Sequence, residues 1–282
     1  MLSTGILLGI AAAFFWGCAD FFAKIAVTRE KKFIPIHISN FVALLVIIGY
    51  NLLNPTPGYS LFTIVPSVIL VSISMTGGWW FFWKSLQSGK LTLQTAVGAS
   101  YGFITLILAV LFLGEKPTFL QVLGAFAIVC GVFLLSGFRS LKKAKFDMNI
   151  FMAFLAALSW GSSYFFLAPI LKVHPIGVVL MSHMFFSQFV SFGIVILTGN
   201  RLLPRDLNNL KPVMAAGLVD SLGIICYYVA AGTILISLLA PISSMYPVFT
   251  AFLAFIFMNE RLTKEQLAFV GMIIIGILLI SL

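Results

Sequence analysis

The sequence has 282 residues, of which 61% are hydrophobic and only 9% are charged, and its net charge is +9. A soluble domain usually carries about 25% charged residues, so this composition excludes an ordinary soluble globular protein. Apolar runs of about 20 residues, the length that crosses the hydrocarbon core of a bilayer, recur along the whole chain. The basic residues lie in the connections between these runs, which indicates orientation in a lipid bilayer and not binding to nucleic acid.

In chain order, the runs predict ten continuous, helical spans, because a barrel would show alternating hydrophobicity instead. No Lys or Arg precedes the first run, and the run is longer than the core of a signal peptide, so we expect it to belong to the fold. The predicted spans are 4–27, 33–53, 62–87, 92–113, 118–138, 148–171, 175–198, 211–232, 235–258 and 263–282.

The two halves of the chain repeat one another. Trp16-Gly17 recurs as Trp160-Gly161, 144 positions later, and residues 101–136 share 12 identities with the segment 145 positions further on. This pattern predicts a five-helix repeat over 1–138, a basic linker over 139–147 and a second five-helix repeat over 148–282. Because five is odd, the second copy enters the membrane from the opposite side, as in the inverted repeats of many secondary transporters.

Lys and Arg also predict the orientation of the chain. The odd-numbered connections between spans hold 13 of them and the even-numbered connections hold 2. Positively charged connections stay in the cytoplasm, so the charge bias predicts a multi-pass protein of the cell (inner) membrane with both termini outside.

Three stretches resemble a known family: "FFWGCADFFAKIA" near the start, "LAVLFLGEKPTFLQVLGAFAIVCGVFLL" at 108–135 and its echo at 253–280. They are similar to the EamA-type family of the drug/metabolite transporter superfamily, over nearly the whole chain. The resemblance implies a central cavity lined mainly by spans 1, 3, 4, 6, 8 and 9, and export or exchange of small metabolites. It also implies both termini in the cytoplasm, the reverse of what the charges indicate.

Asp20 and Asp220 are the acidic residues that lie well inside predicted spans. A charge at the centre of a membrane helix costs about 2.5–3.5 kcal/mol on insertion scales, so such a residue usually faces an interior or a watery cavity. Lys24 lies four residues after Asp20, on the same helix face, and can pair with it. The pair is either a packing contact or a proton- or substrate-binding site, or Lys24 extends to the interface. Asp220 is either a cavity group or a neutral, hydrogen-bonded acid of the bundle.

Aromatic residues are the second candidate group, because aromatic walls suit flat apolar or cationic substrates. The same residues are also typical of packing and of interfacial belts, and both interpretations remain open. The candidates, which include two repeat pairs and the counterpart of Asp20, are Trp16, Trp160, Tyr101, Tyr246, Trp83, Tyr228 and Tyr164.

Interrupted helices in corresponding places of two halves are a pointer to a transporter site. Pro241 and Pro247 disturb the backbone hydrogen bonds of span nine, and Gly98 and Gly102 occupy the matched part of span four. We expect these four residues to act as hinges, although a simple kink is the alternative. Glu115 precedes Thr118, the expected N-cap of span five, and is interpreted as a structural acid near a positive helix end.

The function that these features favour is secondary active transport of a small organic metabolite or drug-like compound by alternating access, with protons as a candidate coupling ion. The catalytic motifs of membrane enzymes and the Walker motif do not occur, so we expect neither enzyme activity nor a cofactor or metal. A passive channel is the first alternative and a membrane enzyme the second. The expected partners are a small-molecule substrate and the bilayer, in a monomer or homodimer.

Overall fold

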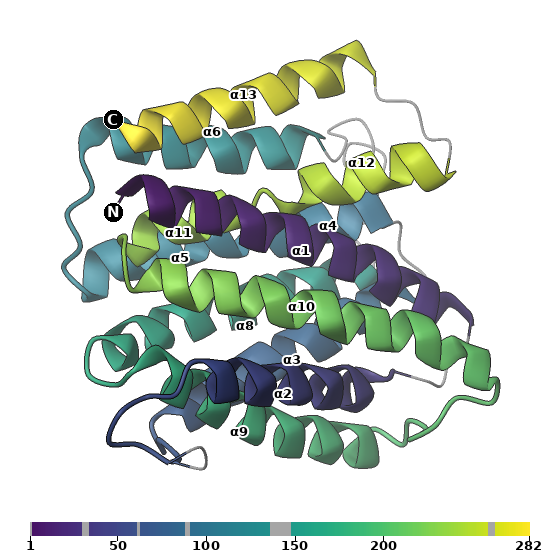
Figure 1. Ribbon diagram of the computed structural model, residues 1–282. Helices are drawn as coiled ribbons and strands as arrows, with labels where there is room; N and C mark the ends of the chain where they lie inside the picture. The colour runs from purple at the N-terminus through teal and green to yellow at the C-terminus, as the bar shows by residue number, and fades with distance from the viewer. Residues whose placement is uncertain (1, 30–33, 61–62, 88–90, 136–147, 259–262) are drawn as a thin grey trace.

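The computed structural model describes residues 2–29, 34–60, 63–87, 91–135, 148–258 and 263–282. Within these ranges the chain forms helices and connections and no strand (Figure 1). The elements are α1 (Leu2–Arg29), α2 (Ile36–Leu53), α3 (Val68–Leu86), α4 (Leu91–Ala99), α5 (Tyr101–Phe112), α6 (Phe119–Leu135), α8 (Met148–Leu171), α9 (Ile176–Leu197), η1 (Leu207–Asn209), α10 (Leu210–Ala231), α11 (Ile236–Ser243), α12 (Tyr246–Met258) and α13 (Lys264–Ser281).

Every predicted span contains helix, so the all-α class is confirmed. Within the described ranges, seven stretches are long and apolar enough to cross a membrane. Shorter apolar helices lie within α6 and α13, and α3 is not among the seven. Ten transmembrane helices therefore stay a prediction. The basic linker predicted at 139–147 lies outside the described residues.

Two of the predicted spans are broken near their middles. Span four divides into α4 and α5 at Ser100, between Gly98 and Gly102, and span nine divides into α11 and α12. The second break follows Pro241 and precedes Pro247. Proline lacks the backbone N–H that a helix needs, and glycine weakens helical preference, so the interruptions occur where the sequence indicated. Pro169 lies inside α8 without dividing it.

Helices of one half pack mainly on helices of the other half. α1 lies along α10, and the corresponding pair, α8 and α3, lies together in the same way; α2 packs on α9 and α6 on α13 (Figure 1). A Cβ atom added at Gly124, early in α6, would lie 2.9 Å from Leu279, late in α13, whereas one added at Gly131 would meet Ile273. The two helices are therefore antiparallel, as an inverted duplication requires of equivalent helices.

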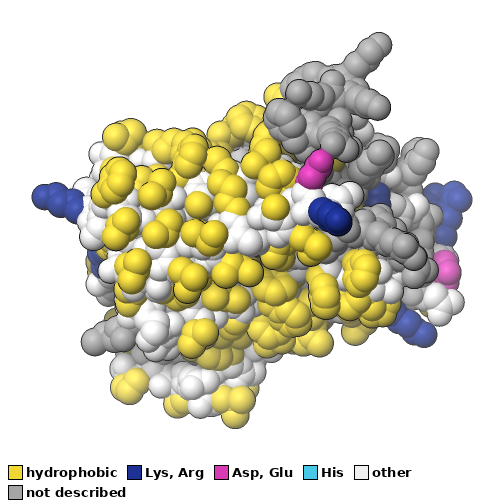
Figure 2. Space-filling model, turned by 90° about the horizontal axis from the view of Figure 1, so that it is seen from above, with side chains coloured by type: hydrophobic (Ala, Val, Ile, Leu, Met, Phe, Trp, Pro, Cys, Tyr) yellow, Lys and Arg dark blue, Asp and Glu magenta, His cyan; other side chains and the backbone are white. Residues whose placement is uncertain are grey.

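The outer surface of the bundle is apolar. Figure 2, a view from above onto α13 and α6, shows hydrophobic side chains over most of the described surface and most Lys and Arg toward its two ends. Phe119 and Phe126 of α6 and Ile275 and Leu278 of α13 are among the exposed apolar residues. An apolar band between charged ends matches the hydrocarbon core of a bilayer between its two polar surfaces.

Candidate functional site: a small cavity between the halves

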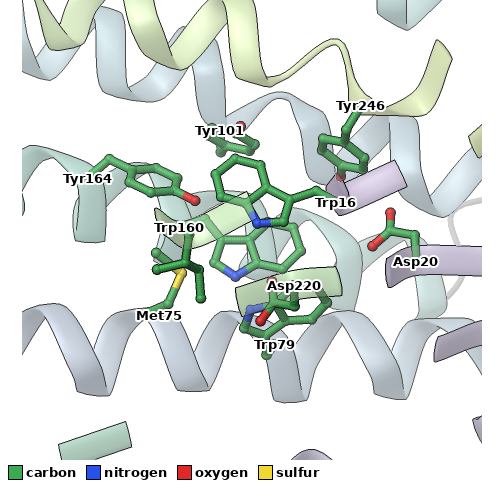
Figure 3. Close-up of a pocket in the computed structure, with 10 residues that line it drawn as sticks. Trp16, Asp20, Met75, Trp79, Tyr101, Trp160, Tyr164, Asp220 and Tyr246 are labelled. Atoms are coloured by element: carbon green, nitrogen blue, oxygen red, sulfur yellow. The ribbon is translucent and has the colours of Figure 1, made fainter. Parts of the chain in front are cut away.

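A small cavity lies where the two halves meet (Figure 3). Its free volume is about 20 Å³, which is room for about one water molecule. Side chains of six helices surround it, and most of them are aromatic. The ten lining residues are Trp16, Asp20, Met75, Trp79, Tyr101, Trp160, Tyr164, Asp220, Ile224 and Tyr246.

The lining is built from matched positions of the two repeats. Each of four helices supplies two residues spaced four apart, which places both on one helix face. Tyr101 and Tyr246, which begin α5 and α12 at the two breaks, complete the ring. With a repeat distance of 144 or 145 positions, the ten residues form five pairs: Trp16 with Trp160, Asp20 with Tyr164, Met75 with Asp220, Trp79 with Ile224, and Tyr101 with Tyr246. The cavity therefore lies on the local two-fold axis that relates the halves.

The two tryptophans of the first pair pack against glycines of the opposite half. A Cβ atom added at Gly223 would lie 2.6 Å from Nε1 of Trp16, and one added at Gly78 would lie 2.6 Å from Nε1 of Trp160. Glycine is therefore required at both places for the indole rings to reach the cavity. The indole N–H group of Trp16 faces the carboxylate of Asp220 and interacts with it. The indole nitrogen of Trp160 has no hydrogen-bond partner among the described residues, because Met75 stands where the other half has Asp220.

Both acids line the cavity and are almost completely buried. The exposed fraction of Asp20 is 1% and that of Asp220 is 6%. Oδ2 of Asp20 and Oδ1 of Asp220 have no hydrogen-bond partner among the described residues. α1 and α10 are neighbours, so the two carboxyl groups share one wall and are close enough to interact electrostatically. The opposite wall, from α3 and α8, carries the neutral counterparts Met75 and Tyr164.

Lys24 is directed away from this wall, which corrects the expected pairing with Asp20. Its Nζ atom donates to the carbonyl oxygen of Leu86, at the end of α3, over 2.7 Å. The four-residue spacing allowed an ion pair within α1, but the long lysine side chain also reaches an unsatisfied carbonyl at a helix C-terminus, where a cation is favoured. Lys24 is therefore a contact between helices and is not among the residues that line the cavity.

The tyrosines at the two breaks join the halves. The hydroxyl of Tyr101 hydrogen-bonds to Oγ of Ser243, the last residue of α11, over 2.8 Å. The hydroxyl of Tyr246 donates to the carbonyl oxygen of Thr95 in α4 over 2.9 Å. Their rings are stacked, with centroids 6.4 Å apart. Each broken helix is thus held by a tyrosine of the other broken helix.

Two further hollows lie on opposite sides of the central cavity. A vestibule of about 490 Å³ near the start of α1 is lined by Ala168, one helical turn beyond Tyr164, and by Glu115. On the other side, a cavity of about 10 Å³ is lined by Asp220, Trp83 and the polar side chains of Ser39 and Asn40 in α2. Asp220 and Trp79 line both this cavity and the central one.

Glu115 is a structural acid of a different helix from the one expected. Thr118 and Gln121 cap the start of α6 reciprocally, with bonds of 3.0 and 3.3 Å, as the sequence indicated. The carboxylate of Glu115 instead accepts the backbone N–H groups of Ile236 and Ser237 at the start of α11, over 3.2 and 2.9 Å. A carboxylate at this end also matches the helix dipole. The first repeat therefore caps a broken helix of the second.

The structure brings seven of the ten predicted site residues together: Trp16, Asp20, Tyr101, Trp160, Tyr164, Asp220 and Tyr246. Trp83 lines the adjacent polar cavity, and Tyr228 hydrogen-bonds to Nδ1 of His183. Sequence reasoning missed Met75, Trp79 and Ile224. Applying the repeat distance to Asp220, and then a four-residue helical spacing, would have found all three. Within the described ranges no group of three His, Cys, Asp or Glu residues could hold a metal ion.

Comparison with known proteins places this geometry in context. A sequence model of the EamA-like transporter family matches residues 3–137 and again residues 147–282. An uncharacterized protein of Methanocaldococcus jannaschii is 30% identical over 139 residues, which are 48% of this chain and 98% of that protein. That relative therefore has the length of one repeat. A solved structure, described only as "Crystal structure of protein", shares the fold with a TM-score of 0.78 at 19% identity, covering 98% of this chain and 96% of that one.

Proposed function

The chain belongs to the EamA-like transporter family, and we propose that it is a secondary active transporter that exports or exchanges a small organic molecule by alternating access. The family, part of the drug/metabolite transporter superfamily, supports membrane transport. The mechanism, the coupling and the substrate class are argued below from the described residues.

The observation that carries the proposal is the position of the central cavity on the local two-fold axis, lined by five repeat pairs. A site shared by two inverted halves is where alternating access places the substrate, because rocking one half against the other opens the same site to either side. The cavity has room for about one water molecule. A larger substrate enters only when the halves separate, so this conformation is closed around the site.

The hollows on either side support two routes to the same site. The vestibule begins one helical turn beyond Tyr164, and the polar cavity begins at Asp220. Three aromatic rings, those of Tyr164, Tyr227 and Trp16, lie between the vestibule and the acids. The ring centroids of Tyr164 and Tyr227 are 4.2 Å apart, and those of Trp16 and Tyr227 are 5.4 Å apart. We assign these rings the role of the barrier that must part on the vestibule side.

The broken helices supply the places where the halves can bend. The space for a Cβ atom at Gly102 is already filled by Ser244, with Oγ 2.6 Å away, so the two breaks pack directly on one another. Gly98, Pro241 and Pro247 flank the same breaks. Interrupted helices lose backbone hydrogen bonds at the break and absorb a change in backbone angles there more readily than continuous helices do.

The two acids are the proposed coupling groups. A buried carboxylate without full hydrogen bonding is costly, whereas the protonated form is not. Proton release and uptake at Asp20 and Asp220 therefore change with the access of water to the cavity. Tyr101, Tyr164 and Tyr246 are the other titratable groups that line it. Asp220 also lines the cavity of about 10 Å³ that contains Ser39 and Asn40, and we assign this side as its route to water when the halves separate.

The experiment is a metabolite screen by thermal shift on the purified protein, because any ligand that prefers the folded state raises its melting temperature. For each compound that stabilises the protein, uptake into proteoliposomes is then measured with and without a pH gradient. We expect gradient-driven accumulation that is lost in Asp20→Asn and Asp220→Asn and kept in Asp206→Asn. Asp206 is a matched control, because it caps η1 far from the site and Asn caps equally well.

The alternatives give different results in the same assay. Flux that only equalises the concentrations inside and outside, with or without a pH gradient, would support a passive channel and contradict coupled transport. Chemical change of a stabilising compound would support a membrane enzyme. Gradient-driven flux that survives in the double variant Asp20→Asn/Asp220→Asn would remove these two residues from the coupling.

A further inference from the structure

We propose that the substrate of this site is an organic cation: a protonated amine that carries one positive charge on an apolar or aromatic body. This assignment rests on the proposed function and names the substrate class of the same site. It follows from the charge, the unpartnered atoms and the ring faces of the central cavity.

The charge of the lining is one-sided. Asp20 and Asp220 are its two ionisable acids, and none of the ten lining residues is basic. Lys24, the basic residue closest to Asp20 along α1, directs its ammonium group to the carbonyl oxygen of Leu86 in α3. A substrate carboxylate or phosphate would thus meet two acids and no cationic side chain of the lining, at a large desolvation cost. A substrate cation instead meets acids of the opposite charge, which offset the cost of removing its own charge from water.

The unpartnered oxygens indicate a hydrogen-bond donor. Oδ2 of Asp20 and Oδ1 of Asp220 are both buried and both lack a partner among the described residues. Buried polar atoms without partners are rare, and each is an acceptor that remains to be satisfied. An ammonium group supplies N–H donors and a charge together, and such charge-assisted bonds are the stronger kind. A neutral alcohol supplies a donor without the charge.

The pair of acids accommodates a single positive charge. The two carboxyl groups share the wall formed by α1 and α10 and interact electrostatically. Two like charges on one wall of a dry site disfavour simultaneous ionisation, so a single negative charge is the favoured state of the pair. The remaining single negative charge balances a monovalent cation. The occupied cavity then carries no net charge.

The rest of the lining offers aromatic faces instead of polar atoms. Trp16, Trp79 and Trp160 are three of the ten lining residues, and tryptophan has the ring that attracts cations best. The hydroxyl groups of Tyr101 and Tyr246 are already bonded to Ser243 and Thr95, so these tyrosines contribute their rings. Figure 3 shows the indole rings of Trp16 and Trp160 near the centre of the group, with Asp220 below them and Asp20 to one side.

The test uses four small compounds that share one phenyl ring and differ in charge: 2-phenylethylamine as cation, 2-phenylethanol as neutral compound, 3-phenylpropionate as anion and phenylalanine as zwitterion. Binding to the purified full-length protein is measured by calorimetry at neutral pH. We expect 2-phenylethylamine to bind at least about tenfold more tightly than each of the other three. Phenylalanine is the sharpest comparison, because it is the same amine with an added carboxylate.

Variants then assign the binding to the site. Asp20→Asn and Asp220→Asn should each weaken 2-phenylethylamine binding by about tenfold or more, whereas Asp206→Asn leaves it unchanged. Trp79→Leu should weaken it more than Trp79→Phe, which keeps a ring. Melting temperatures of all variants show whether they are folded, and the Asn replacements keep the shape of the carboxyl group.

Three results would overturn the assignment: no binding of 2-phenylethylamine to the folded protein, equal or tighter binding of phenylalanine or 3-phenylpropionate, or unchanged amine binding in the folded double Asn variant. Failure of the proposed function looks different. Gradient-driven movement of the zwitterion or the anion in proteoliposomes would refute the substrate class and keep the transporter, whereas tight amine binding without any flux would refute the transporter and keep the cation site.

Discussion

The first and second halves of the chain share their helix order and their packing, yet they place different chemistry at matched positions. Asp20 in the first half corresponds to Tyr164, and Asp220 in the second half corresponds to Met75. Because the halves are inverted, these exchanges place both acids on the wall formed by α1 and α10. The unpartnered indole nitrogen of Trp160 marks the place where the neutral wall lacks an acid. The fold is therefore symmetric, and the site is not.

The comparison separates residues that the fold needs from residues that it tolerates. Contacts that occur twice, such as the two indole rings over Gly78 and Gly223, are requirements of the bundle. Residues that occur once are free of that requirement, because the matched position holds the same fold without them. Asp20 and Asp220 belong to the second class, which is the physical reason to propose a functional role for them.

The largest expected effect comes from removing the asymmetry at one pair. In Asp220→Met both matched positions carry methionine, and we expect gradient-driven flux to fall to background. Stability should change by no more than about 1–3 kcal/mol, because removal of a buried acid is offset by loss of its interaction with the indole N–H of Trp16. Flux in proteoliposomes and the melting temperature measure the two effects, with Asp206→Asn as control. A folded Asp220→Met protein that retains coupled flux would mean that the difference between the walls has no function.

A smaller effect is expected where the halves are alike. An added Cβ atom at Gly276 of α13 would lie 2.7 Å from the carbonyl oxygen of Gly124 in α6, whereas Gly271 of the same helix has open space. Gly276→Ala should lower the free energy of unfolding by about 1–3 kcal/mol through overpacking. Gly271→Ala should leave it equal or slightly higher. Thermal or denaturant unfolding in detergent distinguishes them, and equal values for the two variants would contradict the close packing of α6 on α13.

The smallest effect concerns the two tyrosines of the breaks. Tyr101→Phe and Tyr246→Phe each remove one hydrogen bond between the halves, worth about 0.5–1.5 kcal/mol. Because the residues are matched and both bonds join the halves in the proposed closed form, we expect similar losses of stability and changes of transport rate in the same direction. Opposite changes of rate in the two variants would show that the breaks do not move as equivalent hinges.

Much of this arrangement could be predicted from the sequence, because the repeat and the apolar runs depend on pattern alone. The broken helices followed from Pro241, Pro247, Gly98 and Gly102, whose effects on the backbone are local. The partners of long polar side chains could not be predicted. Lys24 had Asp20 available four residues away, but it bonds to the carbonyl oxygen of Leu86 on α3. Glu115 bonds to Ile236 and Ser237, which lie 121 and 122 positions further along the chain.

The missed lining residues teach the same lesson. Met75 and Ile224 are apolar, so nothing in their chemistry distinguishes them from packing residues, and only their repeat partners Asp220 and Trp79 mark them. Tyr228 is the converse case, because it is among the predicted site residues but does not line the central cavity. Its hydroxyl is taken by His183 of α9, a tertiary contact that neither helical spacing nor the repeat indicates.

Alternating exposure of the central cavity is tested most directly by a cysteine at Met75, in a protein whose Cys18, Cys130 and Cys226 are replaced by alanine. A charged, membrane-impermeant thiol reagent is added separately to right-side-out and inside-out vesicles. Our account predicts that the cysteine is labelled from each side, although the closed cavity has a volume of about 20 Å³. Labelling from one side alone, or from neither, in a folded protein would contradict it.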